Sequence, residues 1–332
     1  MRRGWPYAPR PGRRKLNVQH LPQLASHVRQ ELAKVIVGQG QFIDQLLLVL
    51  VCGGHAVIEG VPGLAKTLAV KSLARICGLS FQRVQCTADL MPADVTGTNV
   101  FNLSASTFSL HRGPVFTDLL LVDEINRTSP RTQAALLEAM EERQVTIDGV
   151  RYPLTENFAV LATQNPIEFE GTYPLPEAQL DRFLLKIRVT YPSAQEEMDI
   201  LSQYEKGFDP RRFEEIALTP LDGALLPQAR REIACVRVEP TLHSYVVSLV
   251  RRTRDWPAIS LGASPRAAVG LFFVARALAG MEGRDYLLPD DIKAAALPVL
   301  RHRIMLKPEA DLEGLTSDQV ISQVIAAVEI PK

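Results

Sequence analysis

Between residues 60 and 67 the chain reads Gly60-Val61-Pro62-Gly63-Leu64-Ala65-Lys66-Thr67. An apolar run at 56–58 precedes this turn, and apolar residues at helical spacing follow it from Leu68 onward. A glycine-containing turn between a strand and a helix directs backbone N–H groups and the helix N-terminus toward one point, which favours an anion. The segment therefore predicts a phosphate-binding loop, in which Lys66 contacts the phosphates and the Thr67 hydroxyl helps to bind Mg²⁺.

Ala65 departs from the general pattern, which has glycine before the lysine. A methyl group is tolerated at this position if the residue has a negative φ, so we expect a negative φ at Ala65. The alternative interpretation of the whole segment is a plain turn between a strand and a helix.

Two acidic residues end a second apolar run, which reads Leu119-Leu120-Leu121-Val122-Asp123-Glu124. Runs of this kind are typical of strands buried on both faces of a parallel sheet. We expect Asp123 to hold Mg²⁺, mostly through water, and Glu124 to polarise the attacking water as a general base. Two surface acids at a strand end are the alternative, but their combination with Lys66 and Thr67 favours a nucleotide site.

Two further strand ends carry amides. The apolar run at 158–163 is followed by Gln164-Asn165, and Asn165 is predicted to hydrogen-bond the γ-phosphate or the attacking water. Gln85 ends the predicted strand at 81–85. Our hypothesis is that Gln85 restrains Glu124 until a partner docks.

The alternation of strands with helices predicts an α/β fold, with a parallel sheet flanked by helices. Ser129 followed by Pro130 is a favourable N-cap and first-turn pair, and it predicts the start of the helix after the run at 119–124. After residue 191 the pattern changes: Ser193 and Glu196 form a capping box, and helical periodicity appears at 242–252, 266–279 and 290–300. Only a weak strand pattern, at 236–238, lies among these helices. We therefore predict three parts, namely a basic and disordered tail at 1–19, an α/β nucleotide-binding core at 20–190, and an all-helical lid domain at 191–332.

Composition narrows the classes of partner. The 332 residues include 37 Lys plus Arg and 37 Asp plus Glu, so no global charge favours nucleic acid. No apolar run approaches the ~20 residues of a membrane helix, so we expect no membrane insertion. The four cysteines are scattered without a CxxC pair, which is typical of reduced thiols and favours a cytoplasmic location.

Over residues 20–305 the chain resembles the MoxR branch of the AAA+ ATPases. The most specific text lies at 162–168 and 171–183, supported by 121–127 and 133–149. Even Ala65 fits, because this branch usually reads GVPGLAKT. The resemblance implies a P-loop NTPase core with an insert near its second helix and a C-terminal helical lid.

The resemblance also implies roles for individual residues. Arg182 matches an arginine finger that reaches a neighbour's γ-phosphate, and Arg266 matches sensor 2 on the lid. Their alternative interpretations are a helix-end cation and a first-turn surface residue. The implied Walker B pair is Asp123 and Glu124, and sensor 1 is Asn165. The implied nucleotide-binding residues are Val37, Gly38 and Gln39 near the adenine, and Gly60, Val61, Pro62, Gly63, Leu64, Ala65, Lys66, Thr67 and Leu68 around the phosphates.

As function, the resemblance implies an ATPase that uses ATP and Mg²⁺, assembles as a homo-oligomeric ring (expected to be a hexamer) and remodels or matures a protein client in a chaperone-like way. The client could belong to the von Willebrand factor A-domain proteins, which often accompany this family. Three alternatives are a chelatase-like motor subunit, an ATP-switched DNA-associated regulator, and a nucleotide-binding scaffold without turnover. Two hairpins are predicted, at 98–110 and 145–152, and Asp148-Gly149 predicts a type I′ turn in the second. They would line the pore or upper face of the ring, or would be ordinary surface ribbons.

Overall fold

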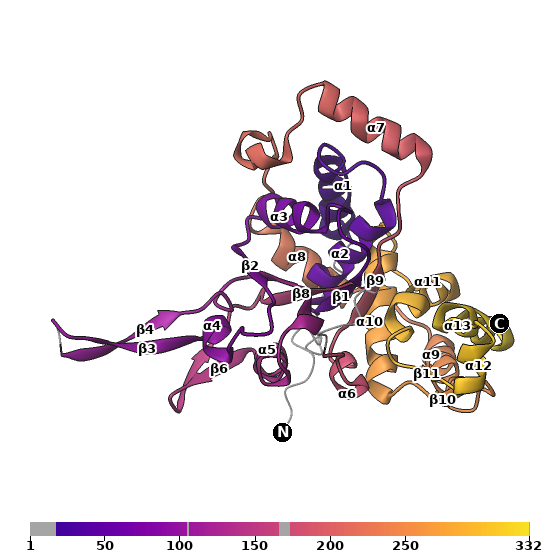
Figure 1. Cartoon of the computed structure of the whole chain (residues 1–332). Helices are drawn as coiled ribbons and strands as arrows, with labels where there is room; N and C mark the ends of the chain where they lie inside the picture. The colour runs from indigo at the N-terminus through magenta and orange to yellow at the C-terminus, as the bar shows by residue number, and fades with distance from the viewer. Residues whose placement is uncertain (1–17, 105, 166–172, 332) are drawn as a thin grey trace. The chain divides into compact units, whose positions relative to one another are not determined.

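The structure is a computed structural model, and it describes residues 18–104, 106–165 and 173–331 (Figure 1). Most of the predicted basic tail and residues 166–168 and 171–172 of the family-specific text lie outside the described residues. The chain divides into two compact units. The core unit comprises Gln30–Phe183 and Ile187–Pro220, and the lid unit comprises Met1–Arg29, Leu184–Lys186 and Leu221–Lys332. The domain boundary that the sequence predicts near residue 191 stays a prediction beside this division.

The core unit is organised around a sheet of five strands in the order β2-β5-β8-β1-β9. The registers of β1 with β8, β5 with β8 and β2 with β5 are parallel. The strands are β1 (Ala56–Glu59), β2 (Phe81–Gln85), β5 (Leu119–Asp123), β8 (Ala159–Gln164) and β9 (Leu185–Arg188). The first four match the predicted strands. Every residue of β5 is buried because helices cover both faces of the sheet.

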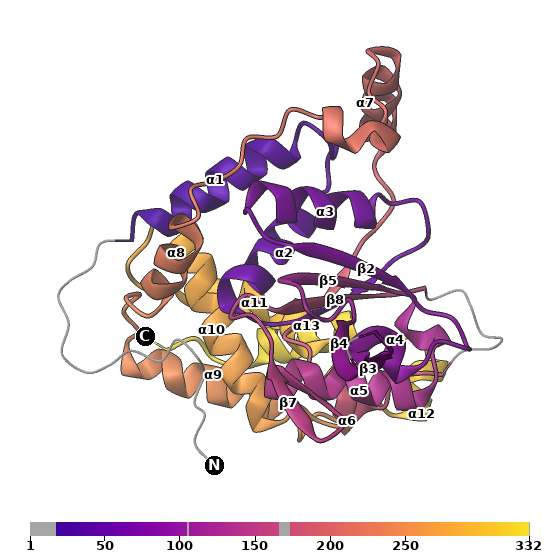
Figure 2. The same cartoon turned by 90° about the vertical axis from the view of Figure 1, so that its left-hand side faces the viewer.

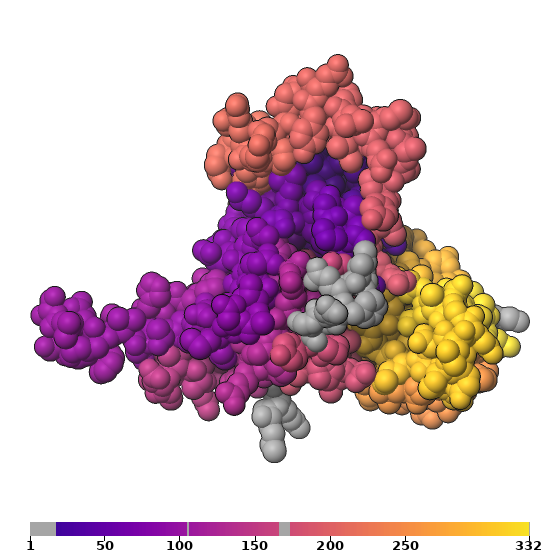
Figure 3. All heavy atoms as spheres, in the orientation of Figure 1, coloured from indigo at the N-terminus to yellow at the C-terminus, as the bar shows by residue number. Residues whose placement is uncertain are grey.

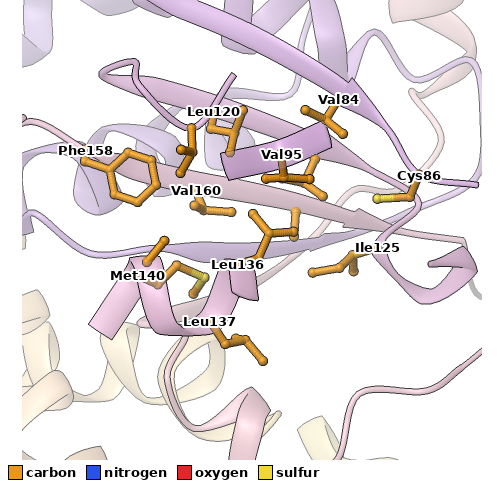
Figure 4. Packing of buried hydrophobic residues seen from close by; sticks show 14 of the residues in the cluster. Val84, Cys86, Val95, Leu120, Ile125, Leu136, Leu137, Met140, Phe158 and Val160 are labelled. Carbon is orange, nitrogen blue, oxygen red and sulfur yellow. The ribbon is translucent and has the colours of Figure 1, made fainter. Parts of the chain in front are cut away.

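Helices α2 (Gly40–Cys52) and α3 (Lys66–Ile76) lie on one face of this sheet, and α5 (Pro130–Glu142) lies on the other (Figures 1 and 2). Helix α5 begins as predicted, because the Ser129 hydroxyl accepts a hydrogen bond from the Thr132 backbone N–H and proline occupies the first turn. The apolar face of α5 packs against β5 and β8 in the buried cluster of Figure 4, which includes Leu120, Leu136, Leu137, Met140 and Val160.

Two antiparallel ribbons extend the core unit. The first pairs β3 (Gly97–Asn102), which follows the short helix α4 (Pro92–Thr96), with β4 (Thr107–Arg112), and it projects visibly from the unit (Figure 3). The second pairs β6 (Gln144–Ile147) with β7 (Val150–Pro153). Its turn has positive φ at both Asp148 and Gly149, which confirms the predicted type I′ turn. The Asn99 amide donates to the Asp148 carboxylate at 2.8 Å and joins the two ribbons.

The remaining elements of the core unit are α6 (Glu177–Leu180), α7 (Ala194–Glu205) and the 3₁₀ helices η1 (Ile125–Arg127) and η2 (Pro210–Glu215). The predicted capping box of α7 is confirmed: the Ser193 hydroxyl accepts from the Glu196 backbone N–H, and the Glu196 carboxylate accepts from the Ser193 backbone N–H. Helix α1 (His20–Leu32) begins in the lid unit and ends in the core unit.

The lid unit is helical, as predicted. Its helices are α8 (Leu225–Ile233), α9 (Pro240–Arg252), α10 (Pro265–Met281), α11 (Pro289–Leu300), α12 (Pro308–Leu312) and α13 (Ser317–Ala327). One small ribbon of β10 (Ile259–Leu261) and β11 (Met305–Leu306) was not predicted, because strands this short carry no readable alternation. The weak pattern at 236–238 gives only a single bridge, between Arg237 and Tyr286. Across the described ranges, every helix is too short or too polar to cross a bilayer.

The packing of α5 yields a stability prediction. Leu136 is fully buried, so Leu136→Ala should cost about 2–5 kcal/mol of unfolding free energy through lost burial and the cavity left behind. The control is Glu138→Ala on the exposed side of the same helix, which should change stability by less than about 0.5 kcal/mol. Urea unfolding followed by tryptophan fluorescence and circular dichroism measures both. Equal midpoints for the two variants would contradict the assigned packing.

Candidate functional site

The parallel registers bring four strand ends to one edge of the sheet. Gln85 pairs with Asp123, Val122 pairs with Ala162, and Glu59 pairs with Gln164. The segments that follow these strands therefore emerge side by side. They enclose a cavity of about 440 Å³ lined by Gly60, Pro62, Gly63, Leu64, Ala65, Lys66, Thr67, Leu68, Arg83, Gln85, Asp123, Glu124, Thr163, Gln164, Asn165, Tyr204 and Pro210.

The predicted phosphate loop connects β1 to α3 along one wall of this cavity. Gly63 has φ +87°, a conformation that strains any residue with a Cβ atom. Lys66 begins α3, and its ammonium group donates to the carbonyl oxygens of Gly60 and Val61. Burial lowers the pKa of Lys66, while the negative charges of Asp123 and Glu124 act in the opposite direction. The ammonium group is thus already directed back over the loop in which a phosphate would be bound.

Ala65 does not have the negative φ that we expected. Its φ is +53° and its ψ is +22°, which is the left-handed helical region. The expectation was wrong because the chain must reverse at this point to begin α3, and that reversal requires the left-handed conformation whichever residue occupies the position. A Cβ atom in this region costs about 1–2 kcal/mol.

The two acids at the end of β5 are held by a hydrogen-bond network. The buried Thr163 hydroxyl donates to Asp123 Oδ1 at 3.1 Å and accepts from the Glu124 backbone N–H at 2.8 Å. The Gln85 amide donates to Glu124 Oε2 at 2.9 Å, so the contact that the sequence suggested is present. Arg127 also pairs with Glu124 Oε2, at 3.1 Å. Glu124 itself has φ +57°, so it is held in a strained conformation.

Arg83 is a cavity residue that our sequence analysis missed. Its Nε donates to Asp123 Oδ2 at 2.6 Å, and its Nη2 donates to Gln85 Oε1 at 3.1 Å. Strand alternation could have revealed it, because residues 83 and 85 share one face of β2. Thr163 could have been found in the same way, as the last buried residue before Gln164 and Asn165. For Tyr204 and Pro210 the sequence offers no such signal.

A loop after β5 is fixed from α5 by a buried glutamine. The Gln133 amide donates to the carbonyl oxygens of Ile125, Thr128 and Tyr173 at 2.9–3.3 Å. The Tyr173 backbone N–H donates in turn to the Asn126 carbonyl. The segment that follows Glu124 and the segment that leads into α6 are therefore tied to the same side chain.

The donor set of the cavity fits a magnesium-bound triphosphate. A loop with its N–H groups at a helix N-terminus and a lysine suits phosphates, and the Thr67 hydroxyl and the Asp123 carboxylate offer hard oxygen ligands. Within the described ranges, His, Cys, Asp and Glu form no group of three that could hold a metal ion. A site with few protein ligands suits Mg²⁺, which keeps waters and takes phosphate oxygens as further ligands.

Several predicted site residues do not line this cavity. Val61 is not among the residues that line the cavity, although its carbonyl oxygen accepts from Lys66. Val37, Gly38 and Gln39 precede α2. Both Gly38 and Gln39 have positive φ, and the Glu196 carboxylate of α7 lies against Gly38 and accepts from the Gln39 backbone N–H. These hydrogen bonds, first those from Ser193 and then that from Gln39, hold the pKa of Glu196 below its usual value.

The two predicted arginines lie in different units. Arg182 follows α6 in the core unit, and its Nη2 lies 3.0 Å from Glu141 Oε2 on α5. About a third of its side chain is exposed, and it does not line the cavity of its own chain. Arg266 lies in the first turn of α10 in the lid unit, where it is exposed. Within the core unit the structure therefore gathers Lys66, Thr67, Asp123, Glu124 and Asn165 at one cavity, and Arg182 is not among the residues that line it.

Comparison with known proteins places this architecture in a class. The model of the ATPase family associated with various cellular activities (AAA) matches residues 55–185, and the model of the AAA lid domain matches residues 251–324. A solved structure from Cytophaga hutchinsonii superposes with a TM-score of 0.86 at 41% identity and covers 95% of this chain and 97% of that one. The fold is that of an AAA+ protein with a helical lid.

Curated relatives narrow the class to one family. Chaperone MoxR1 of Mycobacterium tuberculosis is 44% identical over 91% of this chain and 81% of its own length. YeaC of Bacillus subtilis is 44% identical over 94% and 97%, and protein MoxR of Methylorubrum extorquens is 32% identical over 92% and 93%. The chain belongs to the MoxR family of AAA+ ATPases.

The conformation of Ala65 yields a second prediction. Glycine adopts the left-handed region without a Cβ penalty, so Ala65→Gly should raise the unfolding free energy by up to about 1 kcal/mol. The matched control is Ala134→Gly on the exposed face of α5, which should lower it by about 0.5–1 kcal/mol. Thermal melting of both variants measures these two changes in stability. A loss of stability in Ala65→Gly equal to that of the control would disprove the assigned φ.

Proposed function

We propose that this chain binds ATP with Mg²⁺ at the carboxyl edge of the sheet and hydrolyses it within a homo-oligomeric ring. The observation that carries the proposal is the convergence of the loop, Lys66, Asp123 and Glu124 on one cavity. Membership of the AAA+ ATPases agrees with this chemistry.

Binding begins at the loop. Backbone N–H groups of residues 60–67 and the N-terminus of α3 receive the phosphates, and Lys66 exchanges its carbonyl partners for phosphate oxygens. The Thr67 hydroxyl and the Asp123 carboxylate would hold Mg²⁺, and the Thr163 hydroxyl orients Asp123. Mg²⁺ held there would neutralise negative charge on the transferred phosphate.

Hydrolysis requires a base and an orienting group beside the γ-phosphate. Glu124 is the candidate base, and Asn165 lines the same cavity as a hydrogen-bond partner for the γ-phosphate or the water. Glu124 Oε2 is occupied by Gln85 and Arg127, so these contacts must loosen before the carboxylate can accept a proton. While these contacts persist, they keep the rate of ATP hydrolysis low.

A neighbouring copy completes the site. Arg182 is half buried against Glu141 and does not line its own cavity, which supports a role in trans at the γ-phosphate bound by the next subunit. An arginine supplied in this way is worth about 10³–10⁵ in rate in related phosphoryl-transfer systems. A closed ring, which we expect to be a hexamer, gives every cavity one such arginine. Arg266 of the lid would add a second cation to the nucleotide.

We propose that ATP binding and hydrolysis drive the remodelling or maturation of a protein client in the cytoplasm. MoxR1 of Mycobacterium tuberculosis carries the name chaperone, which supports this direction. The family resemblance adds von Willebrand factor A-domain proteins as candidate clients. A salt-dependent electrophoretic mobility shift with duplex DNA would favour the DNA-associated alternative instead.

The first test removes the base. Glu124→Gln keeps the size of the side chain and one acceptor oxygen but cannot act as a base, so ATP turnover should fall about 10²–10⁴-fold with ATP binding retained. Turnover is measured by phosphate release, binding with a fluorescent ATP analogue, and assembly by native mass spectrometry, which should show accumulated rings. Undiminished turnover would remove Glu124 from its proposed role.

The second test separates binding from action in trans. Lys66→Ala should abolish tight nucleotide binding, and Arg182→Ala should bind ATP but hydrolyse it poorly. Each variant alone should be nearly inactive. Mixed together they should regain activity, because an Arg182→Ala cavity with ATP can receive Arg182 from a Lys66→Ala neighbour. An inactive mixture that still co-assembles would exclude action in trans.

A further inference from the structure

We propose that Arg83 is an internal counter-ion for Asp123, which Mg²⁺ must displace when nucleotide binds. The proposal rests on the proposed function and adds a residue to it. In the structure, the guanidinium of Arg83 lies against the Asp123 carboxylate, which is proposed to hold Mg²⁺.

The geometry makes Arg83 a direct competitor for that carboxylate. Asp123 Oδ1 accepts from Thr163, and Oδ2 accepts from Arg83 Nε at 2.6 Å, so both oxygens are engaged. The Asp123 side chain is only 10% exposed, and the Thr163 hydroxyl is buried between Asp123 and Glu124. The Arg83 side chain is 50% exposed and can swing toward solvent. A metal or its bound water therefore reaches Asp123 most readily on the side of Arg83.

Charge leads to the same conclusion. Asp123 is largely buried, and a buried carboxylate is costly unless a cation pairs with it. Lys66 donates to its own loop, so Arg83 provides the close ion pair that Asp123 has in this structure. Mg²⁺ at Asp123 would supply the compensating charge and repel the guanidinium. One cation replaces the other, and the half-exposed guanidinium of Arg83 turns toward solvent.

The exchange is connected to Glu124 through Gln85. Arg83 Nη2 donates to Gln85 Oε1, which orients the amide so that Gln85 Nε2 points at Glu124 Oε2. Departure of Arg83 removes the contact that fixes this amide. Binding of the metal at Asp123 thus weakens the restraint on the candidate base, and the two acids are coupled through two side chains of β2.

The test is the Mg²⁺ concentration that nucleotide binding requires. A fluorescent ADP analogue is titrated against wild type, Arg83→Gln, Arg83→Lys and Arg237→Gln over a Mg²⁺ series that begins in EDTA. Removal of the competitor should lower the half-maximal Mg²⁺ concentration of Arg83→Gln about three- to tenfold. Arg83→Lys retains the charge and should stay near wild type. Arg237→Gln, which removes an exposed arginine paired with Asp285, controls for the loss of one positive charge.

Thermal melting without nucleotide provides the second readout. Arg83→Gln should melt below wild type when Asp123 lacks a cation, and saturating Mg²⁺ with ADP should shrink the difference. Equal losses in both states, with an unchanged Mg²⁺ requirement, would reduce Arg83 to a structural residue and overturn the inference. A higher Mg²⁺ requirement, or weaker ADP binding in EDTA alone, would make Arg83 a nucleotide ligand and also overturn it. Failure of wild type to bind nucleotide would contradict the proposed function itself.

Discussion

The parallel hydrogen-bonded register of β2, β5, β8 and β1 is the constraint on which the candidate site depends. It places Gln85 beside Asp123, and the end of β8 beside the end of β1, so that groups far apart in the sequence leave the sheet at one edge. Because both faces of β5 are buried, the strand lies in the middle of the packed layers, and its polar end at Asp123 and Glu124 lies at the edge of the sheet. The positions of the polar groups at the edge of the sheet therefore depend on how the strands pack in its interior.

The backbone at this edge is strained where it turns toward the cavity. Ala65 and Glu124 both have positive φ, one at the start of α3 and the other directly after β5. Neither residue is suited to that conformation, so the surrounding packing must hold it. At Glu124 the backbone N–H donates a hydrogen bond to the buried Thr163 hydroxyl near the end of β8, and this bond helps to hold the conformation. Strain is thus concentrated at residues whose neighbours line the cavity.

Much of this arrangement could be predicted from the sequence because it rests on local signals. Apolar runs gave the central strands, Ser129 with Pro130 gave the start of α5, and Asp148 with Gly149 gave the type I′ turn. The negative φ expected at Ala65 was wrong, since residue type indicates preference whereas the chain reversal dictates conformation. The alternation along β2 indicates that Arg83 shares a face with Gln85, but it does not indicate that the guanidinium reaches Asp123 on β5. Tyr204 lines the cavity from α7, and no local sequence pattern indicates that position.

The buried amide of Gln133 has a consequence for communication between subunits. Helix α5 holds the loop after Glu124 and the segment at Tyr173 through Gln133 near one end, and it contacts Arg182 through Glu141 at the other. The segment after Glu124, the segment at Tyr173 and the Arg182 side chain are therefore all attached to one helix of 13 residues. If the proposed ring forms, a shift of α5 caused by a change beside Glu124 would also move the arginine that is offered to the neighbouring copy.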